Sequence, residues 1–197
     1  MKTIVVALLA GCVIANGAFA IVDPDDISMG IYFDANADVF EISSAPYVMV
    51  SAHIILTNPT FPVLYGYEFG YTIYGNHMVS GTNLWGTGPF DVGGGPGNHI
   101  VGLAAPLATN TATKLCTLTL FILDANPIAL TLAGSIPNDV PGSNLPAVSL
   151  AGDGILPIGL SAGLDGAGNP MVSAYINGFG VVASEQASWG QVKSLYR

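Results

Sequence analysis

Residues 64–75 read LYGYEFGYTIYG, and this stretch decides the fold class. Successive side chains of a β-strand point to opposite faces, so the stretch predicts a strand with an aromatic face and a flat, glycine-lined face. The aromatic face consists of Tyr65, Tyr67, Phe69, Tyr71 and Ile73. We expect this face to close the core, because large exposed apolar patches are rare on soluble monomers. The other face, with Gly66, Gly70 and the lone Glu68, is expected to meet a close-packed strand or a contact surface.

Turn residues divide the rest of the chain into short apolar segments. The 197 residues include 25 Gly and 13 Pro and only 9% charged residues, which disfavours long helices. Residues 113–123 predict a central strand, residues 75–76 a hairpin turn between two strands, and residues 85–98 a long glycine-rich loop. Together these features predict an all-β fold, a single antiparallel β-sandwich of jelly-roll or cohesin-like type. The predicted strands are 29–33, 47–57, 64–75, 77–84, 99–105, 113–123, 128–133, 147–150, 155–160, 171–176 and 178–182.

The N-terminus predicts export. Lys2, the apolar run 4–14 and the Ala18-Phe19-Ala20 site form a signal peptide over residues 1–20, which indicates a secreted, extracellular or cell-surface bacterial protein. The alternative is a lipoprotein anchored through Cys12, because residues 9–12 (LAGC) resemble a lipobox. After cleavage, the chain has three Lys or Arg residues and 13 acidic residues, so its net charge is negative. A negative surface repels nucleic acid and anionic lipid, so both are excluded as partners. Cys116 is then the one remaining cysteine, expected as a buried thiol.

The C-terminus differs from the body of the chain. Residues 21–184 are expected to form the sandwich domain, and residues 185–197 a short amphipathic helix with Ser188 and Gln191 as a capping box. So short a helix needs a surface to dock on. Its candidate partner or sorting residues are Trp189, Val192, Lys193, Tyr196 and Arg197.

Residues 66–74, GYEFGYTIY, resemble the G-x-[DE]-F-x-φ-x-[YF] strand of cohesin-like modules, where φ is apolar. These modules are secreted bacterial β-sandwiches, related in architecture to some carbohydrate-binding modules. Residues 113–123 and 178–182 are similar to two later strands of the same modules. The resemblance implies a fold and a secreted setting, but it does not imply dockerin binding. The opening G-D-x-V-x-V-P-V strand is not recognisable, and residues 85–98 look like an insertion.

Asp34, Asn36 and Asp38 have the alternating oxygen spacing of calcium loops, which makes Ca²⁺ a candidate ligand. Val39 and Ala45 stand where an EF-hand needs glycine and glutamate, so the site would be of another kind. The alternative is a solvated acidic turn.

Other side chains suggest carbohydrate chemistry. Tyr74 and Trp85 lie outside the aromatic row and are candidate sugar-binding residues, while the row itself could instead be a stacking platform. Glu68 and Asp91 could form the carboxylate pair of a glycoside hydrolase. The three histidines lack metal-binding spacing, and the chain lacks nucleophile-elbow and phosphate-loop motifs.

These observations predict a non-enzyme, a secreted or cell-surface β-sandwich with a structural, adhesive or assembly role. A protein partner or self-assembly is expected. The alternative is a carbohydrate-binding module, with calcium as a candidate stabilising ion, and the second alternative is a glycoside hydrolase-like enzyme.

Overall fold

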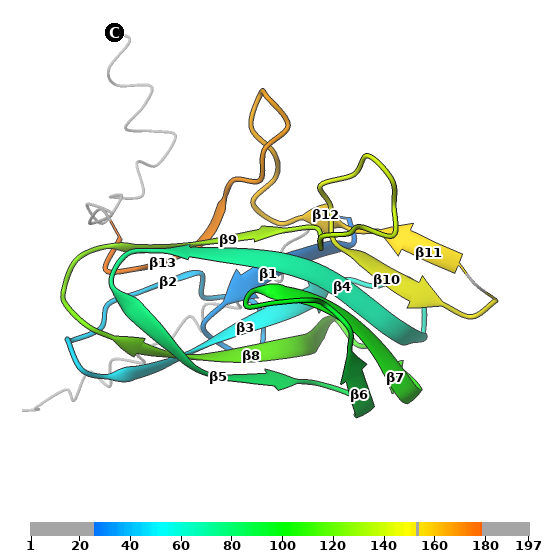
Figure 1. The fold of residues 1–197 in the computed structure, drawn as a ribbon, viewed down its shortest axis with the longest axis horizontal. Coiled ribbons are helices and arrows are strands. Elements are labelled where there is room, and N and C mark those ends of the chain that lie inside the picture. Colours follow the sequence, from blue (N-terminus) through cyan, green and yellow to red (C-terminus); the bar gives the residue numbers. More distant parts are fainter. Residues whose placement is uncertain (1–25, 153, 179–197) are drawn as a thin grey trace, which may run out of the picture.

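The computed structural model describes residues 26–152 and 154–178, which form two β-sheets packed face to face (Figure 1). Sheet A has the order β12 (Gly159–Leu160), β1 (Ser28–Tyr32), β3 (Met49–Thr57), β8 (Ala112–Ile122) and β5 (His77–Leu84). Sheet B has the order β11 (Gly154–Pro157), β10 (Ala147–Leu150), β4 (Val63–Tyr74), β9 (Ile128–Ala133), β13 (Val172–Ile176) and β2 (Glu41–Ile42). In addition, β7 (Asn98–Ala108) pairs with β4, and β6 (Thr87–Asp91) pairs with β7. The predicted all-β sandwich is confirmed.

The core lies between the two sheets and is built from alternate residues of their strands. Leu118, Leu120 and Ile122 of β8 are fully buried together with Leu130 and Leu132 of β9. As predicted, β8 is not an edge strand: it lies between β3 and β5 in sheet A. Within the described ranges there is no helix, and therefore none long and apolar enough to cross a membrane.

Cys116 lies in this core, as predicted from its apolar strand. Burial raises the pKa of its thiol to about 12, with a smaller contribution from the charge of Asp91. The thiol is therefore protonated and unreactive at neutral pH.

The aromatic row of β4 is buried at its centre and open at its start. Tyr67 and Phe69 are 2% and 0% exposed, and their rings stack with centroids 6.0 Å apart. The prediction for Tyr65 is wrong, because its side chain is 40% exposed. The pairing of β4 with β7 shifts register between Leu64 and Gly66, so the alternation breaks there and Leu64 is buried instead.

Three other details differ from the sequence predictions. The sandwich is not purely antiparallel, because β12 pairs parallel with β1, and β2 pairs parallel with β13. Residues 75–76 do not close a hairpin: they carry the chain from sheet B to sheet A, where β5 pairs with β8. The predicted loop 85–98 contains β6, which hydrogen-bonds along β7.

Several predictions fall outside the described residues. These are the signal peptide 1–20 with the alternative anchor Cys12, the closing strand 178–182 beyond its first residue, and the tail helix 185–197. The five candidate tail residues lie there too: Trp189, Val192, Lys193, Tyr196 and Arg197.

Candidate functional site

The glycine-lined face of β4 is the middle of a row of residues that crosses sheet B. Gly66 pairs with Gly102 of β7 on one edge and with Ser149 of β10 on the other. Gly102 pairs in turn with Phe90 of β6, and Ser149 with Ile155 of β11. Residues that pair directly across strands project to the same face. The row therefore places two large apolar side chains at the flanks of three small residues.

This row faces away from the core. The adjacent row across the same strands consists of Val101, Tyr67 and Val148, and all three are buried in the core. Side chains alternate between faces along a strand, so Gly66, Gly102 and Ser149 lie on the outer face of sheet B.

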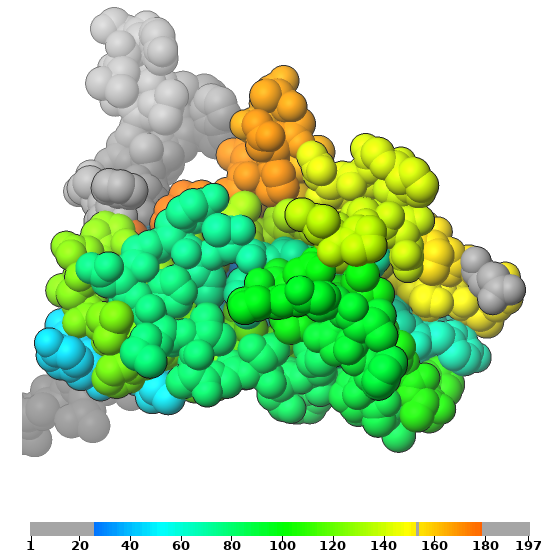
Figure 2. All heavy atoms as spheres, in the orientation of Figure 1, coloured from blue at the N-terminus to red at the C-terminus, as the bar shows by residue number. Residues whose placement is uncertain are grey.

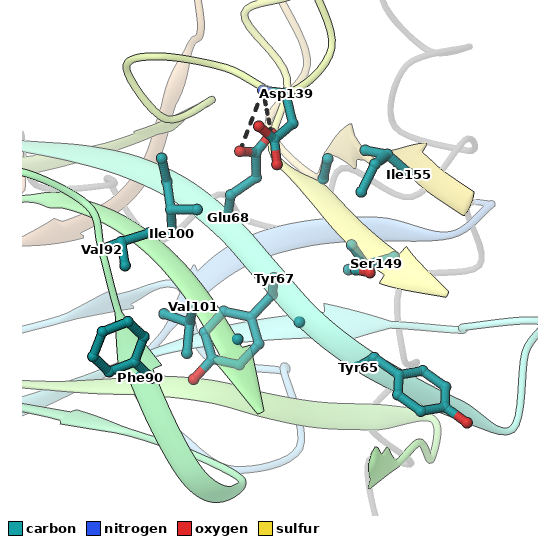
Figure 3. Close-up of a pocket in the computed structure, with 14 residues that line it drawn as sticks. Tyr65, Tyr67, Glu68, Phe90, Val92, Ile100, Val101, Asp139, Ser149 and Ile155 are labelled. Carbon is teal, nitrogen blue, oxygen red and sulfur yellow. Dashed lines mark hydrogen bonds between the residues drawn. The ribbon is translucent and has the colours of Figure 1, made fainter. Parts of the chain in front are cut away.

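A groove of about 290 Å³ occupies this outer face (Figure 3). Its floor is the small residues Gly66, Gly102 and Ser149, and its walls are apolar side chains. The walls remain accessible, with exposed fractions of 71% for Phe90, 60% for Val92, 41% for Ile155 and 40% for Tyr65. Ile100 completes the wall on the side of Val92. We refer to these eight residues, with Glu68 and Asp139 at one end, as the transverse groove.

The two glycines of the floor have different roles. A Cβ on Gly66 would lie 2.6 Å from the carbonyl oxygen of Val101, so glycine is required there for the close approach of β7. A Cβ on Gly102 would have no atom within 4 Å. Gly102 therefore leaves space that a larger residue would fill, and this space is part of the groove.

Glu68 anchors a loop at one end of the groove. Its side chain is on the outer face of β4, yet it is only 4% exposed, because residues 134–146 fold over it. Ser135 Oγ donates to Glu68 Oε2 at 2.8 Å. The Asp139 amide donates to Glu68 Oε1 at 3.2 Å (Figure 3). Figure 2 shows this loop in yellow-green next to the green β7. The carboxylate thus holds the loop that brings Asp139 to the rim of the groove.

Burial shifts the pKa of Glu68. Loss of water raises the pKa of its carboxyl above the ordinary value, and the nearby charge of Asp139 adds to this rise. The hydrogen bonds from Ser135 and from the Asp139 amide oppose the shift only in part.

Asp91 lies on the other face of the sheet from Glu68. It pairs with core residue Val101, and its Oδ2 is 2.6 Å from Nδ1 of His99, whose ring stacks on Tyr71. Burial would raise the pKa of Asp91, but hydrogen bonds from the Gly93 and Ile100 amides and from His99 outweigh burial and hold it below the ordinary value. The two carboxylates therefore do not flank a common cleft, as a glycoside hydrolase would require.

Tyr74 and Trp85 are not brought together. They flank β5 at its opposite ends, and Tyr74 is 60% exposed. Trp85 lies on sheet A, where its Nε1 donates to Thr117 Oγ1 at 3.1 Å and Lys114 Nζ is 4.8 Å from the ring. Their role in carbohydrate binding stays a prediction.

The acidic turn uses its first carboxylate for its own backbone. Asp34 Oδ1 accepts from the amides of Asp38 and Val39, each at 2.9 Å, and Oδ2 accepts from the amide of Asn36 at 3.1 Å. Asp34 therefore caps the turn. The described residues contain no group of three or more His, Cys, Asp or Glu side chains placed to hold a metal ion. Calcium binding by Asp34, Asn36 and Asp38 stays a prediction.

Sequence reasoning singled out the glycine face of β4 but missed the walls of the groove. Phe90 was assigned to a loop, and Gly102, Ser149 and Ile155 carried no signal of their own. Strand register brings these residues together, and no local pattern encodes which strands become neighbours.

Comparisons with known proteins show a likeness of fold. No family model matches the chain, and no curated protein matches it. Among solved structures, a cohesin module from a family 33 glycoside hydrolase of Clostridium perfringens is 10% identical with a TM-score of 0.48, over 77% of this chain and 96% of that chain. The sixth cohesin of scaffoldin B from Acetivibrio cellulolyticus, solved with the Cel5 dockerin, is 11% identical with a TM-score of 0.47, over 78% and 99%. A type II cohesin domain from the cellulosome of the same organism is 10% identical with a TM-score of 0.46, over 78% and 96%. The chain is therefore similar to cohesin modules at the level of a weak fold resemblance, in agreement with its strand motifs.

Proposed function

We propose that the chain is a secreted or cell-surface, non-catalytic adhesive or assembly module that binds a protein segment in the transverse groove. The observation that supports this proposal is the row from Phe90 to Ile155 across five strands of sheet B. Large apolar walls stay exposed beside a floor of Gly66, Gly102 and Ser149. Such a concave apolar surface is suited to one or two apolar side chains of a partner.

The charge of the molecule specifies the partner further. The chain carries a formal net charge of −9, and Asp139 stands at the rim of the groove. The one cation among the described residues, Lys114, lies on sheet A over Trp85. We therefore assign the groove to a segment that presents an apolar anchor next to Lys or Arg, because charge complementarity speeds association and selects partners.

The functional groups of the site fit binding better than catalysis. Glu68 is committed to the loop 134–146, and Asp91 lies on the opposite face of the sheet. The remaining groove residues other than Ser149 and Tyr65 are apolar, glycine or, in Asp139, a single exposed acid.

The test uses a displayed library of random peptides selected on the purified protein. We expect enriched peptides to combine an aromatic or aliphatic residue with Lys or Arg. Gly102→Val fills the open space of the floor and should weaken their binding by about tenfold or more. The matched control is Gly81→Val on β5, where an added Cβ meets only ordinary contacts, at 3.8 Å from Thr119. A second pair, Phe90→Ala and the control Met78→Ala, removes an exposed apolar side chain from each sheet.

The outcomes separate the possible occupants. Peptides that bind Gly102→Val as well as the native protein would refute the groove as the binding surface. If the native protein sediments as a dimer and Gly102→Val as a monomer, the occupant of the groove is a second copy of the chain and not a segment of another protein. Much tighter peptide binding after removal of residues 188–197 would show that the chain's own tail competes for the groove.

A further inference from the structure

The occupant proposed for the transverse groove has the same chemistry as one segment of this chain. The groove calls for an apolar anchor next to Lys or Arg, because its walls are apolar and Asp139 stands at its rim (Figure 3). The sequence contains four Lys and Arg residues, and two of them, Lys193 and Arg197, lie within its last five residues. Trp189 and Tyr196 supply aromatic anchors beside them. Trp, Tyr and Arg are the residues that most often dominate the binding energy of an interface.

The other two cations do not meet this requirement. Lys114 lies over the Trp85 ring on sheet A, and Lys2 belongs to the predicted signal peptide 1–20. Residues 189–197 are therefore the one free match to the groove in the sequence that follows the predicted signal peptide. We refer to residues 189–197 as the tail segment.

The register of sheet B fixes the point from which the tail segment departs. The last described residue, Gly178, follows β13 by two residues. Ile176, at the end of β13, pairs with the first residue of β9, and the second residue of β9 pairs with Tyr74 of β4. The end of β13 is therefore level with Tyr74, which lies eight residues along β4 from Gly66 in the groove floor.

The tail segment is long enough to reach the groove of its own chain. Strands rise about 3.3 Å per residue and lie about 4.8 Å apart, and β13 is two strands from β4, so Gly66 lies about 28 Å from the end of β13. The 11 residues from Gly178 to Trp189 span up to about 36 Å when extended. The additional length allows the chain to pass beside the loop 134–146, which stands over Glu68 on the direct route.

The outer face of sheet A is the competing surface for the tail segment. Met49, Phe121 and Met78 pair across β3, β8 and β5, and both methionines are exposed. However, none of the strands of sheet A contains Asp or Glu, and their one charged residue is Lys114. A segment with two cations gains no charge complementarity there. Charge therefore favours the groove on sheet B, although both surfaces are apolar.

We propose that the tail segment occupies the transverse groove of the same chain, with Trp189 over the glycine floor and the two cations near Asp139. This inference rests on the proposed function, because it assigns an occupant to the same groove. The tail segment covers the apolar walls until an external segment displaces it. An external partner thus competes with an intramolecular ligand, which lowers the apparent affinity of the module for that partner.

The test is a spin-label experiment on the ¹⁵N-labelled full chain. A nitroxide is attached at Ser194→Cys, within the tail segment, and broadens the signals of nearby amides. Cys12 is replaced by Ser, and Cys116 is buried with a protonated thiol, so the label has one attachment site. We expect the amide signals of Gly102 and Ile155, which lie in the groove, to lose most of their intensity.

Matched variants connect this broadening to the groove. Trp189→Ala removes the anchor and should weaken docking by about tenfold, so the intensities at Gly102 and Ile155 should recover. Phe90→Ala removes a wall of the groove and should act in the same direction. The control is Met78→Ala, which removes an exposed apolar side chain from sheet A and should leave the broadening unchanged. The amide spectrum of each variant reports whether the fold is retained.

A mixing experiment distinguishes the chain's own tail from that of a second copy. Spin-labelled chain without ¹⁵N is mixed with an equal amount of ¹⁵N-labelled chain without the spin label. Docking within one chain predicts no broadening in this mixture. Broadening of the groove amides in the mixture would overturn the proposal and assign the groove to the tail of a neighbouring copy.

Two further results would overturn the proposal. One is broadening at Thr117 and Met78, which would place the tail segment on sheet A. The other is full intensity of the groove amides in the spin-labelled chain. A selected peptide then decides about the groove separately. If the peptide shifts the amides of Gly102 and Ile155, the proposed function stands without the tail, and if it does not, both proposals are refuted.

Discussion

The outer faces of the two sheets each expose an aromatic side chain, but the surroundings of the two side chains differ. On sheet A, Trp85 is 41% exposed, its Nε1 is bonded to Thr117, and Lys114 covers its ring. On sheet B, Phe90 is 71% exposed and stands beside a floor that begins with Gly102. An exposed aromatic residue therefore does not define a binding surface by itself. The hollow built from small neighbours distinguishes sheet B from sheet A.

The largest expected effect on stability comes from comparing one glycine on the outer face of each sheet. Gly66→Ala on sheet B would place a Cβ 2.6 Å from a backbone oxygen, so strands β4 and β7 must move apart. We expect a loss of about 3 kcal/mol in the free energy of unfolding. Gly81→Ala on sheet A meets only ordinary contacts and should change stability by less than about 1 kcal/mol. Urea denaturation measures both, and similar losses at the two sites would remove the distinction between a tight floor and an open face.

The next effect concerns the charged residue of each face. Glu68→Ala leaves the Asp139 amide without its acceptor and leaves Ser135 with the Pro137 carbonyl as its one remaining acceptor, and it should cost about 2 kcal/mol. Lys114→Ala on sheet A removes a partly exposed cation from the Trp85 ring and should cost about 0.5 kcal/mol. If Glu68→Ala proved as mild as Lys114→Ala, Glu68 would not be the anchor of the loop 134–146.

Glu68 should also give the stability a characteristic pH dependence. Because its pKa is raised in the folded state, the folded protein holds this proton more tightly than the unfolded chain does. The native protein should therefore lose stability relative to Glu68→Gln as the pH rises from the ordinary glutamate pKa of 4.5 through the higher folded pKa. Melting temperatures of both proteins between pH 4 and pH 8 measure this difference. A relative gain of native stability with rising pH would contradict the raised pKa.

Apart from the mild reference substitutions Gly81→Ala and Lys114→Ala, the smallest effect is on sheet A. Thr117→Val keeps the shape of the side chain but removes the oxygen that accepts from Trp85 Nε1 and lies 3.0 Å from His53 Nδ1. We expect a loss of about 1 kcal/mol, since Trp85 is partly open to water. Thermal unfolding measures it. A loss as large as that of Gly66→Ala would show that the polar contacts of sheet A, rather than the close packing of sheet B, dominate the stability of the outer faces.

Local patterns predicted the strands but not all of their neighbours. The alternation in residues 64–75 and 113–123 located two long strands correctly, because strand periodicity is a local property. The hairpin at residues 75–76 was wrong, because its turn residues are equally compatible with a crossing from one sheet to the other. The parallel pairs involve β2 and β12, which have two residues each and no pattern of their own.

The candidate site was predicted in part for the same reason. Gly66 and Glu68 marked the outer face of β4, while the bulge that exposes Tyr65 and the register that aligns Phe90 with Ile155 depend on contacts between distant segments. The acidic turn was correctly located. Two details could not be predicted from the sequence. Asp34 caps the turn because of the turn conformation, and Asp38 lines a pocket because of that conformation and of a β-bulge at Ser173 in β13.

The most direct test of the central claim is to map a selected peptide on the native protein by NMR. The ¹⁵N-labelled chain is titrated with the peptide, and the amide shifts of the two outer faces are compared. The transverse groove predicts the largest shifts at Ile100, Gly102, Ser149 and Ile155, with little change at Lys114 and Thr117. Shifts concentrated around Trp85 and Thr117 on sheet A would contradict the assignment of the groove.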